Sequence, residues 1–248
     1  MGLLDVLDRH KQVALSFSGG KDSTACAWKL RDRWEGITFY HLDTGDLLPE
    51  VVEVVDQVRR LVPHWVTVRS DPAAWMAANG LPSDLVPHSS HPVGQHMAEG
   101  VRLSSRYDCC GANLMAPLFR RIRNDGNTLL IRGTKRADMR RLPMRSGEVL
   151  EGVELLLPLL EWSDADVMAY LAFMGAPVSS AYSHFTNLPE CATCPAWWGE
   201  GRAAYLRGRH PALFARLQER MHAVMGEVGP VAANLATELK VLGGQAGE

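Results

Sequence analysis

The chain of 248 residues has few aromatic residues, five cysteines and no marked excess of charge of either sign. Its formal net charge of -2 gives no overall attraction to nucleic acid, so a polyanionic partner would have to be held by a local patch. No apolar run approaches the length that spans a bilayer, and residues 1–12 lack the apolar stretch of a secretion signal. We therefore expect a cytoplasmic protein with no membrane partner.

No cysteine follows residue 194, and four of the five cysteines form two close pairs. The pairs are Cys109-Cys110 and Cys191-x-x-Cys194. Because cytoplasmic thiols are normally reduced, such pairs indicate a metal or redox site before they indicate disulfides. Four thiolates suit either zinc or an iron-sulfur cluster. Cys26 is spaced like a core residue of a helix, so we expect a buried thiol there.

Short apolar runs alternate with amphipathic stretches along most of the chain. Predicted strands cover residues 13–17, 37–42, 65–68, 129–132 and 155–157, and predicted helices cover residues 22–33, 48–61, 112–123 and 164–174. This alternation predicts an α/β fold with a doubly wound parallel sheet. Hydrophobic residues make up 46% of the chain, which is enough for one sizeable core.

Two regions depart from the alternation. Residues 71–105 contain several prolines, and we predict a long covering loop there. After Cys194 the composition shifts towards tryptophan and arginine, and two helical patterns follow over 211–225 and 230–242. We therefore predict a main domain over residues 1–190 and a C-terminal helical appendage over 191–248, which completes the cysteine site.

The most informative segment reads S-G-G-K-D-S and follows the first predicted strand directly. Its residues are Ser18, Gly19, Gly20, Lys21, Asp22 and Ser23. Adjacent glycines let backbone N–H groups approach an anion, while the serines and the lysine add donors and charge. The helix that starts near Asp22 directs its positive end to the same place. The segment predicts a phosphate-binding turn bordered by Ser16, with a spacing different from that of the common ATPase loop.

Two other predicted strands also end in residues suited to a nucleotide. Leu42, Asp43 and Thr44 end the second, and Gly133 ends the fourth, where Lys135, Arg136, Arg140 and Arg141 follow. In doubly wound sheets ligands collect beyond the carboxyl ends of the strands, so we expect these segments to share one crevice. The cations suit a phosphate or a sulfate, and their local charge also permits a nucleic-acid contact.

Together these motifs resemble the PP-loop ATP pyrophosphatase and phosphoadenosine phosphosulfate (PAPS) reductase superfamily, over roughly residues 13 to 198. The resemblance implies an adenine nucleotide alpha hydrolase-like fold that binds ATP or adenylylsulfate, with Mg²⁺ at the phosphates. It implies that Leu42, Asp43 and Thr44 border the adenosine, and that Lys21, Asp22, Lys135 and Arg136 act in catalysis. It also implies a [4Fe-4S] cluster on the four paired cysteines, as in adenylylsulfate reductases.

The chain departs from the reductases at the missing C-terminal cysteine, which in those enzymes attacks the sulfate sulfur, and at Lys135, which stands where they have arginine. We therefore predict an enzyme that adenylates a substrate, converting ATP to AMP and pyrophosphate, for sulfur transfer to an acceptor such as nucleic acid. This scheme requires a sulfur donor or thiol partner protein. Two alternatives remain: a sulfonucleotide reductase that uses an external thiol, and a non-enzymatic nucleotide sensor. A homodimer is compatible with each.

Overall fold

The computed structural model describes residues 3–85, 102–140 and 144–243, and these fall into two compact units. The first unit comprises residues 1–70 and 114–190, and the second comprises 71–113 and 191–248. The chain passes from the first unit to the second between Glu190 and Cys191. Residues 71–113, which the sequence assigned to the main domain, cluster instead with the C-terminal segment.

The first unit is built on a six-stranded sheet with the order β3-β2-β1-β6-β8-β7. Its strands are β1 (Val13–Ser16), β2 (Ile37–Asp43), β3 (Trp65–Arg69), β6 (Leu129–Ile131), β7 (Val149–Leu150) and β8 (Val153–Leu156). All pairs are parallel except that of β7 with β8. Parallel strands joined through helices form the α/β class, so the predicted fold class is confirmed.

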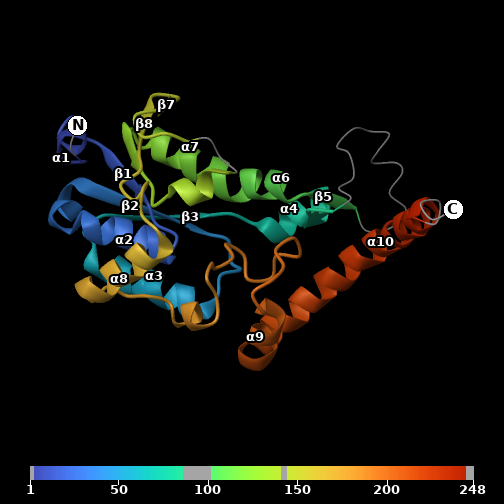
Figure 1. The fold of residues 1–248 in the computed structure, drawn as a ribbon. Helices are drawn as coiled ribbons and strands as arrows, with labels where there is room; N and C mark the ends of the chain where they lie inside the picture. Colours follow the sequence, from blue (N-terminus) through green and yellow to red (C-terminus); the bar gives the residue numbers. More distant parts are fainter. Residues whose placement is uncertain (1–2, 86–101, 141–143, 244–248) are drawn as a thin grey trace. The chain divides into compact units, whose positions relative to one another are not determined.

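Helices cover both faces of this sheet, with α7 on one face and α2, α3 and α8 on the other (Figure 1). The helices of the unit are α1 (Leu3–Leu7), α2 (Lys21–Lys29), α3 (Pro49–Leu61), α7 (Ala116–Asn124) and α8 (Asp164–Met174). Helix α8 begins and ends where the sequence predicts, because Ser163 and Asp166 form a reciprocal capping box. Helix α2 is shorter than predicted, since a 3₁₀ helix over Arg31–Gly36 replaces its last turn.

The centre of the sheet is the core of the unit. Strand β1 is paired on both sides, so that Val13 lies opposite Ile37 and Leu129, and Ala14 and Leu15 are fully buried. A strand covered on both faces reads as a continuous apolar run, which is why the sequence located it well. Residues 17–20 follow the carboxyl end of this strand and connect it to α2.

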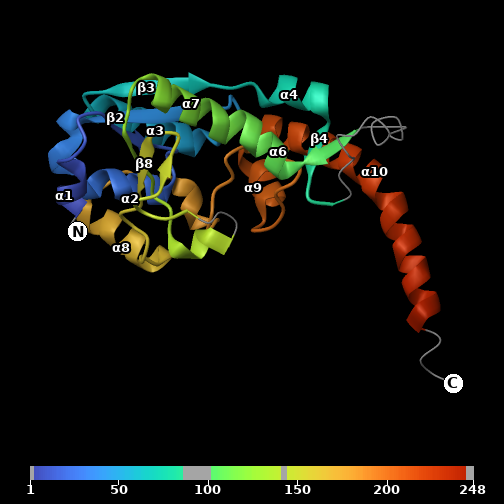
Figure 2. The same ribbon diagram turned by 90° about the horizontal axis from the view of Figure 1, so that it is seen from above.

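The second unit contains α4 (Pro72–Asn79), the parallel pair β4 (Leu81–Ser83) and β5 (Leu103–Ser105), α6 (Arg106–Cys110), α9 (Arg202–Arg209) and α10 (Pro211–Gly243). In Figure 2 α6 runs beside β4, and β4 also contacts α10. The predicted loop over 71–105 is wrong where the structure describes it, because α4, β4 and β5 occupy its ends. No described helix is both long and apolar enough to cross a bilayer.

The prediction of two C-terminal helices is also wrong, because a single helix α10 runs through Pro230. Val224 and Val228 are buried against Leu103 just before the proline, so packing holds this part of the helix. Pro230 itself is exposed, and one missing N–H donor does not end a helix that is held on the preceding turns.

Replacing Gly133 by alanine should lower the free energy of unfolding by about 1–3 kcal/mol, the usual cost of overpacking. A Cβ atom at residue 133 would lie 2.6 Å from the carbonyl oxygen of Asp22, so the end of β6 would have to move away from α2. Urea unfolding measures the change. Gly36→Ala is the matched control, because nothing lies within 4 Å of its Cβ position. Equal stabilities of the two variants would contradict the tight contact.

Candidate functional site

The loop between β1 and α2 is held in shape by its own serines. The Ser18 backbone N–H donates to Ser23 Oγ at 3.2 Å, and the Gly20 N–H donates to Ser18 Oγ at 3.3 Å. Ser23 Oγ in turn donates to the Gly20 carbonyl at 3.0 Å. The two serines of the predicted phosphate turn therefore orient its backbone, which is what a preformed anion site requires.

Two glycines allow other elements to approach this loop closely. Gly19 has a φ of 81°, and a Cβ atom there would lie 2.7 Å from Val55 Cγ2 of α3. Gly133 lies against the first turn of α2. The backbone of that turn leaves no room for a side chain at residue 133. The loop after β1 and the loop after β6 therefore meet at the N-terminus of α2, as the sequence predicts.

Two buried lysines and two carboxylates form an ion cluster beside the loop. Lys21 Nζ lies 3.5 Å from Asp22 Oδ2 and 3.3 Å from Asp164 Oδ1. Lys135 Nζ lies 2.5 Å from Asp22 Oδ1 and 3.3 Å from the same oxygen of Asp164. Both lysine side chains are 3% exposed, whereas the carboxylates are partly open. The cluster joins the segments that follow β1, β6 and β8.

The electrostatics of the cluster favour its charged form. Burial opposes the charge on Lys135, but the hydrogen bond to Asp22 and the negative charges of Asp22, Asp138 and Asp164 outweigh it and raise the Lys135 pKa. Burial likewise opposes ionisation of Asp164, yet the two lysines lower the pKa of that carboxyl below its usual value. Lys135 therefore keeps its positive charge, and Asp164 its negative charge, at neutral pH.

A segment near the end of the first unit closes over the loop. Tyr182 Oη accepts a hydrogen bond of 2.9 Å from the backbone N–H of Lys21. Lys21 Nζ donates to the Thr186 carbonyl at 3.1 Å and to Asn187 Oδ1 at 3.4 Å. Between this segment and the loop lies a pocket of about 240 Å³, lined also by Asp22 and Glu190.

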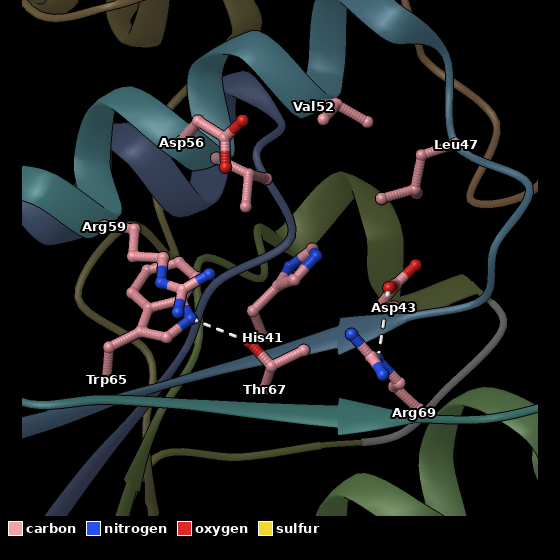
Figure 3. A pocket seen from close by; sticks show the side chains of 10 residues that line it. His41, Asp43, Leu47, Val52, Asp56, Arg59, Trp65, Thr67 and Arg69 are labelled. Atoms are coloured by element: carbon pink, nitrogen blue, oxygen red, sulfur yellow. Dashed lines mark hydrogen bonds and ion pairs between the residues drawn. The ribbon is translucent and has the colours of Figure 1, made fainter.

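A second pocket, of about 540 Å³, lies between α3 and the strands β2 and β3 (Figure 3). Leu47 lines both pockets, so the two are neighbours. Burial lowers the pKa of His41, and its Nδ1 lies 3.0 Å from the Phe17 carbonyl. A neutral imidazole must donate from Nδ1 to that oxygen, which leaves Nε2 as an acceptor. The indole of Trp65 is fixed by donation to Thr67 Oγ1 at 2.9 Å.

The other residues predicted for the nucleotide lie at the carboxyl edge of the sheet. Ser16 ends β1, and Leu42 and Asp43 end β2. Asp43 Oδ1 accepts from the Gly45 N–H at 2.8 Å and lines the second pocket. Thr44 is buried and accepts from the Asp46 N–H at 3.2 Å.

Arg136 and Arg140 are not brought into the ion cluster in the part of the chain that the structure describes. The guanidinium of Arg136 is exposed and pairs with Glu161 at the surface. The side chain of Arg140 lies outside the described residues. Of the predicted cations after Gly133, Lys135 alone among the described ones takes part in the cluster.

The four paired cysteines all belong to the second unit. Burial, together with the negative charges of the neighbouring Cys110 and Cys194, raises the pKa of Cys109 to about 12. Asn113 Nδ2 lies 3.7 Å from Cys109 Sγ. The donor set thus fits a thiolate-bound metal in its chemistry. No group of three or more His, Cys, Asp or Glu side chains among the described residues is arranged to hold a metal ion.

Three arginines surround these thiols, from α6, α9 and α10. Burial raises the pKa of both Cys194 and Cys109, and the arginines oppose it only in part: Arg202 and Arg106 act on Cys194, and Arg220 acts on Cys109. Arg202 is 3% exposed, and its guanidinium carbon Cζ lies 5.0 Å from the centroid of the Trp197 ring. Positive charge of this kind stabilises thiolates, which are the form that binds metal.

Sequence reasoning missed several residues of the site, namely Asp164, Tyr182, Thr186, Asn187 and the arginines near the cysteines. Asp164 could have been found, because it follows the end of β8 on the same edge of the sheet as the loop. Tyr182 lies in a short 3₁₀ helix over Ser180–Ser183, and neither it nor Asn187 belongs to a motif that the sequence analysis used.

Fold and site together define a nucleotide-binding α/β protein with a phosphate loop after its first strand. The family model for the phosphoadenosine phosphosulfate reductase domain matches residues 12–188, more than half of the chain. The chain therefore belongs to this family, within the PAPS reductase and PP-loop superfamily of nucleotide-binding enzymes.

Relatives of known activity are distant. An adenosine 5'-phosphosulfate reductase of Neisseria meningitidis is 25% identical over 189 residues, covering 70% of this chain and 72% of that protein. One of Allochromatium vinosum is 23% identical over 207 residues, covering 75% and 73%. The crystal structure of a PAPS reductase from Candida auris covers 73% of this chain and 81% of its own, with a TM-score of 0.47 and 12% identity.

Acid should remove the contribution of Asp164 to stability. Because its pKa is lowered in the folded state, this contribution is present above the ordinary value of 3.8 and is lost as the pH falls through the folded value. Asp164→Asn should therefore lower the free energy of unfolding at pH 7, and the difference from the parent should shrink below pH 3.8. Urea unfolding at several pH values tests this. A difference that does not vary with pH would contradict the ion pairing.

Proposed function

We propose that the protein binds an adenine nucleotide with its phosphates on the loop over Ser18–Ser23. The observation that carries this proposal is the ion cluster, which holds Lys21 and Lys135 beside a preformed turn at a helix N-terminus. Backbone N–H groups and fixed cations are the usual ligands of a phosphate. Membership of the family supports the adenine nucleotide.

The second pocket suits the adenosine part of the same ligand. It adjoins the loop pocket through Leu47, and its volume of about 540 Å³ is in the range of small-molecule sites. His41 Nε2 offers an acceptor for an amino group, and Trp65 offers an aromatic face (Figure 3). Asp43, from the motif that borders adenosine in this superfamily, lies in its wall.

We propose that the reaction is adenylation. A substrate oxygen attacks the α phosphorus of ATP, the bond to the bridging oxygen breaks, and pyrophosphate leaves with its negative charge. Lys21, Lys135 and the loop amides would stabilise the charge that grows on the phosphates. A sulfide-level nucleophile from the donor then attacks the substrate atom that bears the adenylated oxygen, a bond to sulfur forms, the bond to that oxygen breaks, and AMP leaves with the oxygen.

Asp22 and Asp164 fit a magnesium ion at the phosphates. Mg²⁺ is commonly held by one or two carboxylates together with substrate phosphates, so a dedicated group of three acidic side chains is not needed. Both carboxylates contact the lysines that would face the phosphates, and both remain partly open. When bound, Mg²⁺ would supply charge neutralisation at the leaving pyrophosphate.

A sulfonucleotide reductase is the second candidate, and the relatives support it more directly than the first. They bear the name adenosine 5'-phosphosulfate reductase, and this chain covers 72–73% of two of them. In that reaction a thiolate attacks the sulfate sulfur, AMP leaves, and a second thiol releases sulfite while the two sulfurs form a disulfide. Because no cysteine follows Cys194, an external thiol would have to make the attack.

We further propose that Cys109, Cys110, Cys191 and Cys194 hold a [4Fe-4S] cluster. The support is that all four belong to one unit and that arginines lie near Cys109 and Cys194, where their charge offsets part of the effect of burial. The sulfurs would have to adjust to become ligands together, because the described side chains do not form a ready metal site. A bound cluster would supply iron-sulfur chemistry to the second unit.

Product analysis separates the candidates. Protein purified without oxygen should release pyrophosphate and AMP from Mg-ATP with a candidate acceptor, and no sulfite from adenylylsulfate with thioredoxin. Lys21→Ala should raise the dissociation constant for ATP about tenfold or more, since a hydrogen bond to a charged group contributes roughly 1.5–3 kcal/mol. Sulfite from adenylylsulfate would support the reductase instead. ATP binding that is unchanged in Lys21→Ala would contradict the phosphate site itself.

Cluster binding is tested by iron and labile-sulfide analysis. Cys109→Ser and Cys194→Ser should each lose most of the iron and the brown colour of the parent, because each removes one of four ligands. Cys26→Ala is the matched control, since Cys26 is buried in the first unit and should leave the iron content unchanged. Zinc in place of iron in the parent, or full iron in the serine variants, would show that the cluster assignment is wrong.

A further inference from the structure

The hydroxyl of Tyr182 has an unused hydrogen-bond donor beside the phosphate loop. A phenol both accepts and donates, and here the acceptor side is occupied by the backbone N–H of Lys21 at 2.9 Å. Among the described residues no acceptor is recorded for the Tyr182 proton. Burial raises the pKa of Tyr182, so the hydroxyl keeps its proton at neutral pH. Tyr182 is partly buried and lines the loop pocket, so a ligand in that pocket can accept this hydrogen bond.

The position of this hydroxyl is fixed from several sides. The Lys21 N–H is one of the free donors at the N-terminus of α2, and it holds Tyr182 Oη against the loop. The Tyr182 ring centroid lies 5.3 Å from Lys21 Nζ, and that ammonium is also tied to the Thr186 carbonyl. The hydroxyl is 3.3 Å from the Cβ position at Gly20, so it stands at the floor of the loop pocket.

We propose that Tyr182 donates its hydroxyl proton to a phosphate oxygen of the nucleotide and so selects phosphorylated ligands. This inference rests on the proposed function, because it places the phosphates on the same loop. The phenol oxygen accepts a hydrogen bond from the Lys21 N–H, and the phenol proton can in turn be donated to a ligand. The ligand would therefore meet the Tyr182 hydroxyl in place of the backbone N–H. Tyr182 is therefore a specificity-determining residue in contact with the ligand.

Calorimetric titration with Mg-ATP and with adenosine tests this role. Tyr182→Phe keeps the ring over Lys21 and removes only the hydroxyl, so the dissociation constant for ATP should rise about tenfold while that for adenosine stays unchanged. Tyr170→Phe is the matched control: Tyr170 lies in α8, packs on Trp162, and should leave both constants unchanged. Thermal unfolding of each variant verifies that it is folded.

The outcomes distinguish this inference from the proposed function. If Lys21→Ala weakens ATP binding and Tyr182→Phe does not, the role of Tyr182 is wrong and the phosphate site stands. If neither variant weakens ATP binding, both proposals are wrong. Tighter ATP binding by Tyr182→Phe would show that the hydroxyl competes with the phosphate for the Lys21 N–H, and equal weakening of ATP and adenosine would show a structural role. Either result would overturn the inference.

Discussion

The ion cluster of Lys21, Asp22, Lys135 and Asp164 is the interaction on which the first unit's function depends. Each lysine lies within 4 Å of both carboxylates, and Asp138 Oδ2 adds a third carboxylate 3.7 Å from Lys135 Nζ. Removing one partner from such a set leaves an uncompensated buried charge, which is strongly destabilising. The cluster therefore fixes the loops after β1, β6 and β8 relative to one another before any ligand arrives.

This arrangement suits a site that receives a highly charged ligand. Phosphates entering the loop pocket would take over contacts that the carboxylates now make to the lysines, and a divalent cation would then balance the carboxylates. The lysines would thus already be in position when the ligand arrives, which favours electrostatic stabilisation of charge on the phosphates. Tyr182 and Asn187 close the other side of the pocket, shortly before the chain enters the second unit at Cys191.

The sequence predicted the parallel core and the phosphate loop because both are local. Buried strands appear in the sequence as apolar runs, and the loop after β1 has its glycines, serines and lysine within six consecutive residues. Helix α8 was located correctly because its cap, Ser163, acts within three residues. By contrast, Asp164 reaches Lys21 only after the chain has folded, and no local pattern shows that contact. The sequence analysis wrongly divided α10 at Pro230. The packing of Val224 and Val228 that stabilises the continuous helix is a tertiary contact, which the local sequence does not show.

Amide hydrogen exchange of the loop, with and without Mg-ATP, tests the central claim most directly. The N–H groups of Ser18, Gly20 and Lys21 already donate within the site, so phosphates on the loop should slow exchange at Gly19, Asp22 and Ser23, while amides of α10 should be unaffected. ATP binding with no added protection at residues 18–23, or with protection confined to the second unit, would contradict the account.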